Sequence, residues 1–140
     1  MGPIKHQQPS HLEDLTDEEC LEHLGYGAYV GRLGFIRDGR PIILPVNYLV
    51  EGREVVFRSA EGSVLAALDG ELVAFEVDST RPLEHAGWSV LAHGTVRRVI
   101  DQAELEKLRR GALRSWAWMA ADEWFRVRIT AVSGRRLGRG

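Results

Sequence analysis

The stretch that decides the fold runs from Pro41 to Ser59 and reads PIILPVNYLVEGREVVFRS. Two apolar runs flank a turn that contains Gly52, and this pattern predicts a β-hairpin. Each run ends in polar side chains that a simple core hairpin does not need: Asn47 in the first run, and Arg58 with Ser59 in the second. A guanidinium beside a hydroxyl suits an anionic phosphate, and an amide beside an apolar strand suits a flat heterocycle. The hairpin therefore indicates a site for a ligand that has both a ring and a phosphate.

The composition is that of an ordinary globular protein with one domain. Of the 140 residues, 44% are hydrophobic and 27% are charged, and the formal net charge is −2. This charge lacks the basic excess of a nucleic-acid-binding protein, and no apolar run has the length of a membrane span, so neither partner is expected. Cys20 is the only cysteine, which excludes an intramolecular disulfide and favours a reducing, cytoplasmic location. We expect a loose arm over residues 1–12 and a single domain over residues 13–140.

The rest of the chain predicts further strands around this hairpin. They show continuous apolar runs or alternation of apolar and polar residues, and short turns such as Asp38-Gly39 join them. Gly94 interrupts one of the strands and is expected at a bulge or a barrel corner. Helices do not alternate regularly with strands, so an antiparallel barrel with peripheral helices is favoured over a doubly wound parallel sheet. The six expected strands cover residues 26–36, 41–49, 53–59, 72–78, 87–96 and 124–132.

Three short helices are expected beside the strands. The first follows a capping box at residues 16–19 and stops at Gly25. The second follows Asp101, which resembles the start of another capping box, and runs to about Leu113. The third has one or two turns within residues 61–68. These helices are too short and too few to form a layer of their own, so they are placed at the periphery of the barrel.

The order and spacing of eight short motifs resembles the pyridoxamine 5′-phosphate oxidase-like family. More narrowly, the chain resembles the small actinobacterial flavin-binding branch, which is related to nitroimidazole-resistance proteins. The likeness covers about residues 11–138, nearly the whole chain. The motifs are Gly31–Phe35, Gly39–Pro41, Pro45–Tyr48, Phe57–Ser59, Gly62-Ser63, Val73–Asp78, Gly87–Val90 and Gly134–Leu137.

This resemblance implies a six-stranded antiparallel split β-barrel, a homodimer, and FMN bound at the dimer interface. It also implies, through a weaker correspondence, that Arg136 reaches a ligand of the partner subunit. The implied cofactor-binding residues are Pro45, Val46 and Asn47 along the isoalloxazine edge, Arg58, Ser59, Ser63 and Val64 at the phosphate, and Trp88 and Ser89 near the flavin or the dimer seam.

The chain departs from the family pattern at two positions. Relatives often carry Thr-Lys after the glycine turn, whereas this chain has Ser63-Val64, and Val64 offers a backbone N–H but no charge. Relatives also often carry an arginine in the Trp-containing strand, where this chain has His93. A charge-assisted hydrogen bond contributes about 1.5–3 kcal/mol, so each lost contact weakens phosphate binding by roughly one to two decades. Weak FMN binding, or a preference for another ligand, is compatible with these differences.

Several other residues have simpler interpretations than a functional one. Cys20 falls at helical spacing with apolar residues, which indicates a buried side chain and not a nucleophile. Glu76 and Asp78 alternate with apolar residues, which favours a solvated strand face over a general acid–base pair. The histidines show no metal-ligand spacing, so no metal site is expected, and no residue is nominated as catalytic. Core or dimer contacts are expected for the aromatic residues Trp116, Trp118 and Trp124.

Two functional hypotheses follow from the residues and the resemblance. The first is an FMN-dependent oxidoreductase acting on a small flat substrate, in which FMN carries the redox chemistry. Strict pyridoxamine-phosphate oxidation is disfavoured, because no second phosphate-binding cluster is recognisable. The alternative is a non-catalytic module that holds FMN, haem or the deazaflavin F420, or that holds nothing tightly. F420 has a long anionic tail that requires a basic groove, for which Arg32, Arg37 and Arg40 are the nearby candidates.

Overall fold

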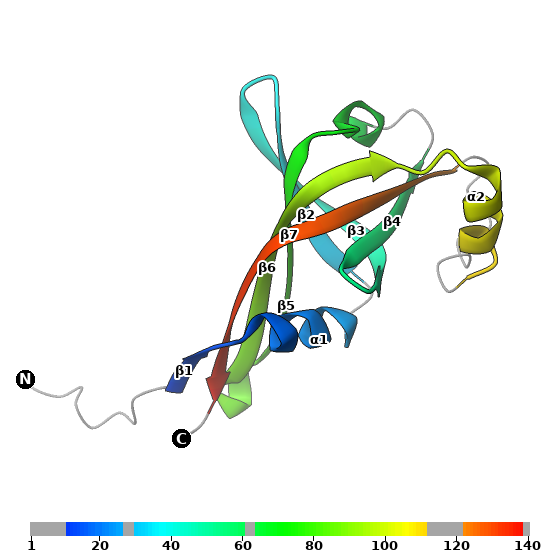
Figure 1. The fold of residues 1–140 in the computed structure, drawn as a ribbon. Helices are drawn as coiled ribbons and strands as arrows, with labels where there is room; N and C mark the ends of the chain where they lie inside the picture. Colours follow the sequence, from blue (N-terminus) through cyan, green and yellow to red (C-terminus); the bar gives the residue numbers. More distant parts are fainter. Residues whose placement is uncertain (1–10, 27–29, 61–63, 112–121, 139–140) are drawn as a thin grey trace, which may run out of the picture.

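The computed structural model describes residues 11–26, 30–60, 64–111 and 122–138 of the chain. Its elements are β1 (His11–Asp14), α1 (Asp17–Gly25), β2 (Val30–Arg37), β3 (Arg40–Glu51), β4 (Glu54–Ala60), η2 (Val64–Leu68), β5 (Leu72–Arg81), η3 (Pro82–Glu84), β6 (Ala86–Arg98), α2 (Gln102–Arg109) and β7 (Asp122–Gly138). The seven strands form one antiparallel sheet in the order β1-β7-β4-β3-β2-β5-β6. Strand β6 also pairs with β7, so the sheet closes on itself as a barrel (Figure 1). The expected mainly β antiparallel barrel with peripheral helices is confirmed.

The described residues contain one more strand than the six expected, because a short strand lies where the sequence indicates a loose arm. Strand β1 starts at His11 and pairs with residues 135–138 at the end of β7. Its four residues have no apolar alternation that would mark a strand. The strand forms because the edge of β7 offers backbone N–H and C=O groups that need partners.

Other element boundaries also differ from the expected ones. Strand β2 begins at Val30 and not at residue 26, because Tyr26 is the C-terminal cap of α1. Helix α2 ends at Arg109, short of the expected Leu113. The expected third helix is a single stretch of 3₁₀ helix over residues 64–68, so the described part of the chain contains two α-helices. Residues 61–63, which begin that expected helix, lie outside the described part.

The apolar side chains form two clusters on opposite sides of the sheet. The first cluster fills the barrel and includes Leu33, Val55, Phe57, Phe75, Val77, Val90, Phe125 and Val127, all with exposed fractions of 1% or less. The second cluster lies between the sheet and α2 and consists of Val56, Val99, Leu105, Leu108 and Trp124, with Leu49 packed beside it. Part of β4 and β7 is therefore buried on both faces, which explains why Val55, Val56 and Phe57 form an uninterrupted apolar run.

Helix α1 packs against β7, β3 and β6, and lies beside the lower parts of β6 and β7 in Figure 1. The expected capping box is present: the Glu19 amide donates to Thr16 Oγ1 at 3.2 Å, and the Thr16 amide donates to Glu19 Oε1 at 2.9 Å. The bond from the Thr16 amide stabilises the charged carboxylate and, with a smaller contribution from the Thr16 side chain, lowers the pKa of Glu19. The helix buries Cys20 and Leu24 completely, as expected for Cys20, and burial raises the pKa of the Cys20 thiol. The helix is also joined to the barrel by the Tyr48 hydroxyl, which donates to the Leu24 carbonyl at 2.8 Å.

Gly94 lies at a bulge, one of the two features expected there from the sequence, but the extra residue of the bulge is Thr130 on the partner strand β7. The register of the β6–β7 pairing shifts between His93 and Gly94. A Cβ atom at position 94 would lie 2.1 Å from the Arg128 carbonyl oxygen, so no larger residue fits while the two strands remain paired. The glycine thus allows β6 and β7 to stay paired at this close approach, and this pairing closes the barrel.

The hydrogen bond of Tyr48 predicts a loss of stability at alkaline pH. Burial raises the pKa of Tyr48 to about 12, whereas an exposed tyrosine in the unfolded chain titrates near 10. The folded protein therefore keeps a proton that the unfolded chain loses, and stability is fully present below pH 10 and falls as the pH rises towards 12. We expect this group to remove about 2 kcal/mol of unfolding free energy over that range, measured by urea denaturation. The variant Tyr48→Phe is the control, and pH profiles that run parallel in the two proteins would contradict the prediction.

Candidate functional site

The polar residues of the hairpin lie at its open end, on β3 and β4, but their side chains divide between the two faces of the sheet. Val46 is 7% exposed and packs in the barrel core, so the flanking Pro45 and Asn47 point to the outer face, Pro45 exposed and Asn47 half-buried. On β4, Phe57 points into the core, so Arg58 points outward and Ser59 has the inward orientation. The β3–β4 pairing ends at the Tyr48–Phe57 pair, and Asn47 and Arg58 each lie one residue beyond it on the outer face. The outer face therefore brings together the amide and the guanidinium that the sequence nominates.

Arg58 is held in place by an aromatic ring. It is paired in register with Trp124 of β7, and its guanidinium carbon lies 5.8 Å from the centroid of the Trp124 ring. Trp124 is completely buried between the sheet and α2, as part of the second apolar cluster. A cation over an indole face is attracted by the ring quadrupole, and the fixed ring limits the positions that the guanidinium can take. Arg58 is thus a half-buried cation that is oriented before any ligand arrives.

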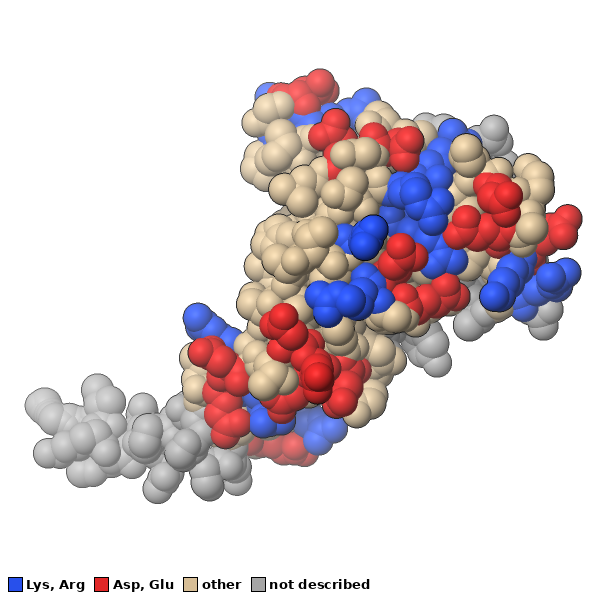
Figure 2. All heavy atoms as spheres, in the orientation of Figure 1, with Lys and Arg blue, Asp and Glu red and all other residues tan. Residues whose placement is uncertain are grey.

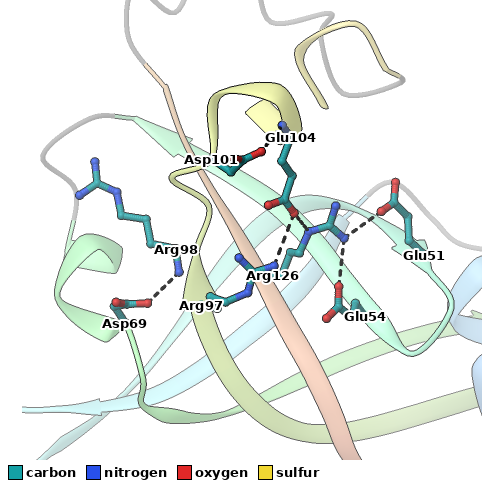
Figure 3. A network of polar contacts seen from close by, with 8 residues as sticks. All are labelled: Glu51, Glu54, Asp69, Arg97, Arg98, Asp101, Glu104 and Arg126. Atoms are coloured by element: carbon teal, nitrogen blue, oxygen red, sulfur yellow. Dashed lines mark hydrogen bonds and ion pairs between the residues drawn. The ribbon is translucent and has the colours of Figure 1, made fainter. Parts of the chain in front are cut away.

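Helix α2, which covers Trp124, is clamped to the hairpin by a polar network centred on Arg126 (Figure 3). The Arg126 guanidinium donates to Glu104 of α2 at 2.5 Å, and to Glu51 and Glu54 at the β3–β4 turn at 2.8 and 3.0 Å. The Asp101 side chain caps α2 by accepting from the Glu104 amide at 2.9 Å. The Glu104 carboxylate bonds Arg126 instead of returning to the cap, so the second capping box is only half formed. One arginine with an 11% exposed side chain therefore links the helix, β7 and the tip of the hairpin.

Trp88 and Ser89 are adjacent in β6 and point to opposite faces. Trp88 packs against the barrel core, with its ring edge-on to His23 of α1 at a centroid distance of 4.8 Å. Ser89 is exposed on the outer face and is paired in register with Arg135 of β7. Strand β7 lies between β6 and β4 of the hairpin, and Ser89 pairs with β7 at Arg135, beyond the residues 122–128 that pair with β4. Arg136, which the resemblance connects with a partner's ligand, forms an ion pair with Glu13 at 2.9 Å.

Some nominated residues fall outside the described part of the chain. Ser63 lies in the segment 61–63, and Trp116 and Trp118 lie in the segment 112–121. Val64 begins η2, but its side chain is also outside the description. The phosphate-binding roles of Ser63 and Val64 therefore stay predictions.

The carboxylates of β5 form ion pairs on the outer face. Arg32 Nη1 donates to Glu76 at 2.9 Å and to Asp78 at 3.2 Å. Burial raises the pKa of Glu76, and the neighbouring Asp78 raises it further, while Arg32 acts in the opposite direction. Glu76 and Asp78 thus lie on a strand face where they form ion pairs, which is close to the solvated strand face expected from the sequence. Arg32 is already bound to these two carboxylates. Within the described residues, no group of three or more His, Cys, Asp or Glu side chains is arranged to hold a metal ion, and no helix is long and apolar enough to span a bilayer.

Sequence reasoning missed an apolar surface next to the hairpin residues. Val30, paired with Asn47, is 48% exposed, and Ile43 on the same face of β3 is 69% exposed. Ile36 and Leu72 of the neighbouring strands are 65% and 67% exposed on that face. The signal was present in β3, where Ile42, Ile43 and Leu44 are all apolar although alternation buries only one face. Figure 2 shows a largely uncharged surface along the β2–β3 hairpin, with acidic and basic side chains concentrated beside it.

The fold and the site define a class of protein: a closed antiparallel barrel with a half-buried, ring-supported arginine beside an apolar outer face. The chain belongs to the pyridoxamine 5′-phosphate oxidase family, which matches residues 16–136. An uncharacterized protein of Mycobacterium tuberculosis is 34% identical over 137 residues, covering 94% of this chain and 89% of that protein.

Solved structures agree with this assignment. The FAD binding protein of Mycobacterium smegmatis is similar with a TM-score of 0.78 and 35% identity, covering 91% of this chain and 100% of that one. A FAD-binding protein of Mesorhizobium loti has a TM-score of 0.77 and 25% identity, covering 92% and 98%. A proposed 5-nitroimidazole antibiotic resistance protein of Bacteroides thetaiotaomicron shares the fold at a TM-score of 0.72 and 14% identity, covering 93% and 90%. The family and the split-barrel fold inferred from the sequence motifs are confirmed.

The Arg126 network predicts an effect on the stability of the domain. Arg126→Met leaves three carboxylates close together without their cation, and we expect it to lower the free energy of unfolding by about 2–3 kcal/mol. The cost is below that of a fully buried pair, because the side chain of Glu51 is 47% exposed to water. Arg81→Met is the matched control, because the Arg81–Glu84 pair is exposed, and we expect its effect to be under about 0.5 kcal/mol. Equal effects of the two substitutions in urea denaturation would show that the network does not clamp α2.

Proposed function

We propose that the chain binds a flavin through the outer face of the β3–β4 hairpin and acts as a flavin-dependent oxidoreductase on a small flat substrate. The observation that carries the proposal is that Asn47 and a pre-oriented Arg58 both lie on the outer face, each one residue beyond the Tyr48–Phe57 pair, beside the exposed Pro45 and Val30. The two similar solved proteins named as FAD-binding support a flavin over other ligands. FMN is the minimal ligand that uses both features, because it has one flat ring system and one phosphate.

The described residues fit such a ligand. Arg58 provides a bidentate cation for a phosphate, and its position over Trp124 reduces the freedom that it loses on binding. Asn47 can exchange hydrogen bonds with the polar edge of an isoalloxazine, while Pro45 offers an apolar contact to the ring. Val46 has its side chain in the core, so its contribution to the ligand comes from the backbone. Bound flavin would supply hydride or electron transfer, and these residues would bind and orient it.

The deazaflavin F420 is less well supported. Its anionic tail would require Arg32, Arg37 and Arg40 to form a basic groove. Arg32 already contacts the carboxylates of Glu76 and Asp78. The Nε atom of Arg37 lies 3.8 Å from Oδ2 of Asp38. A long anionic tail would compete with these internal acidic partners, so FMN or FAD is preferred.

Flavin titration tests the binding proposal directly. The purified protein is titrated with FMN and with FAD while flavin fluorescence quenching is followed, and extracted ligand is identified by mass spectrometry. We expect Arg58→Ala to weaken binding of the flavin phosphate at least about tenfold, because a charge-assisted hydrogen bond is lost. Arg81 is an exposed residue at the end of β5, directly before η3. We expect Arg81→Ala to leave the flavin affinity unchanged. A purified protein that is colourless and quenches the fluorescence of neither FMN nor FAD would contradict flavin binding. An unchanged flavin affinity in Arg58→Ala would remove Arg58 from the site.

Activity is tested separately from binding. The flavin-loaded protein is supplied with a nicotinamide reductant and a nitroaromatic acceptor, and turnover is followed by absorbance. Binding without turnover across reductants and acceptors would favour the non-catalytic carrier over the oxidoreductase.

We further propose that the chain is a homodimer joined through the outer face of the barrel, with the flavin at the interface. The support is that Ile36, Ile43 and Leu72 are more than 60% exposed on the face that carries Pro45 and Asn47. A second copy would remove these side chains from water and would cover a flat ring lying on the hairpin.

The dimer proposal predicts the mass of the wild-type protein in solution and a substitution that dissociates the dimer. Light scattering is expected to give twice the 15.7 kDa of one chain. Ile43→Glu is expected to shift the mass to that of the monomer, because a charge would be buried at the interface. Leu83→Glu is the matched control, since Leu83 is 95% exposed on η3, away from this face. A wild-type protein that is monomeric at all concentrations would contradict the proposal.

A further inference from the structure

A depression on the outer face of the barrel lies away from the hairpin, where β1, β7 and β6 run side by side. Its volume is about 550 Å³, and Asp14, Ser89, Leu91, Ser133 and Arg135 are among its lining residues. Small-molecule sites commonly have volumes of 300–1,000 Å³ with an apolar lining and a few polar groups. A second depression of about 260 Å³ shares Ser89 and Arg135 with the first, so the two flank the same pair of residues.

Strand register explains why these polar groups meet. Asp14 of β1 is paired with Arg135 of β7, and Arg135 is paired with Ser89 of β6, so the three form one row across the strands. Leu91 and Ser133 are also paired, and they form the next row of outward-pointing residues along β6 and β7. The depression thus contains one guanidinium, two hydroxyls and an apolar side chain on the same face.

Arg135 is loosely engaged compared with its neighbour. Its ion pair with Asp14 spans 4.0 Å, and the Asp14 side chain is 93% exposed. Arg136 instead holds Glu13 at 2.9 Å through a direct hydrogen bond. An exposed, long ion pair contributes little to stability, so a ligand can displace Asp14 at small cost.

We propose that this depression binds a small monocarboxylate with an apolar body, and that Arg135 is its principal anchor. The carboxylate of Asp14, from the same chain, already lies 4.0 Å from the Arg135 guanidinium, as the carboxylate of a ligand would. Ser89 and Ser133 can donate to the second carboxylate oxygen, and Leu91, which is 39% exposed, can contact the body of the ligand.

The acidic neighbours argue for a single negative charge on the ligand. Asp14 lines the first depression and Asp78 lines the second. A phosphate dianion would be repelled by both, whereas a monocarboxylate replaces the charge of a displaced Asp14 one for one. This site is separated from the proposed flavin site along β7, because β4 pairs with residues 122–128 of β7 whereas Ser89 pairs with Arg135.

The experiment uses benzoate as the probe on the full chain, without added flavin and again with saturating FMN. Binding is followed by two-dimensional ¹H–¹⁵N NMR, including the arginine Nε–Hε signals. We expect benzoate to shift signals of β6 and β7 and of the Arg135 side chain, and benzamide, which has the same shape without the charge, to bind at least about tenfold more weakly.

Matched variants locate the anchor. Arg135→Gln is expected to weaken benzoate binding at least about tenfold, and Arg136→Gln to change it by less than about twofold. Asp14→Asn is expected to strengthen binding, because the competing carboxylate is removed. Circular dichroism and thermal unfolding of each variant confirm that the fold is retained, as expected for a side chain that is 65% exposed.

Four results would overturn the proposal: no benzoate-dependent shifts at high millimolar concentration, equal losses in the two arginine variants, equal binding of benzamide, or tighter binding of phenyl phosphate than of benzoate. The last would mark the depression as a site for dianions. Because benzoate binding is measured without flavin, failure of flavin binding and failure of this site remain distinguishable.

Discussion

The antiparallel pairing of β7 with two other strands is the constraint on which the rest of the structure depends. Its first half pairs with β4 and most of its length pairs with β6, and this double pairing closes the barrel. The two strands approach most closely at Gly94, where the Arg128 carbonyl leaves no room for a Cβ atom, and a bulge at Thr130 of β7 lies beside this position. The free edge at the end of β7 then receives β1.

Closure also determines which residues are available for a ligand. In a barrel with a packed interior, one side chain of every adjacent pair points inward, and Val46 and Trp88 are on that side. The outward set contains Pro45, Asn47 and Ser89. The outer face is therefore the functional face of the proposal, and residues adjacent in sequence contribute to it in different ways.

Helix α2 packs on the outer face at one point and forms a further layer there. Helix α2 covers Trp124, Trp124 supports Arg58, and Arg126 fastens the helix to the hairpin turn. The cation that the proposal assigns to the flavin phosphate is thereby connected to the stability of the domain. Loss of the Arg126 network is expected to act on Arg58 indirectly, through the position of the ring beneath it.

Much of the fold followed from local patterns in the sequence. The hairpin, the capping box at Thr16 and the bulge at Gly94 depend on alternation, capping and glycine geometry, which act over a few residues. Strand β1 could not be predicted, because it forms only where the end of β7 provides a partner. The support of Arg58 by Trp124 was equally hidden, since 66 positions separate the two residues and only the β4–β7 register brings them together.

The sequence by itself determined the family, the mainly β architecture, and the residue types at the end of the hairpin, because these depend on motif order and local periodicity. The tertiary structure alone decided which face each of those residues occupies and which partner it meets. It placed Asn47 and Arg58 on the same outer face at the end of the β3–β4 pairing, turned Val46 and Trp88 towards the core, and placed Ser89 with Arg135. The physical reason is that side-chain alternation is local, whereas strand register and barrel closure are set by backbone hydrogen bonds between distant segments.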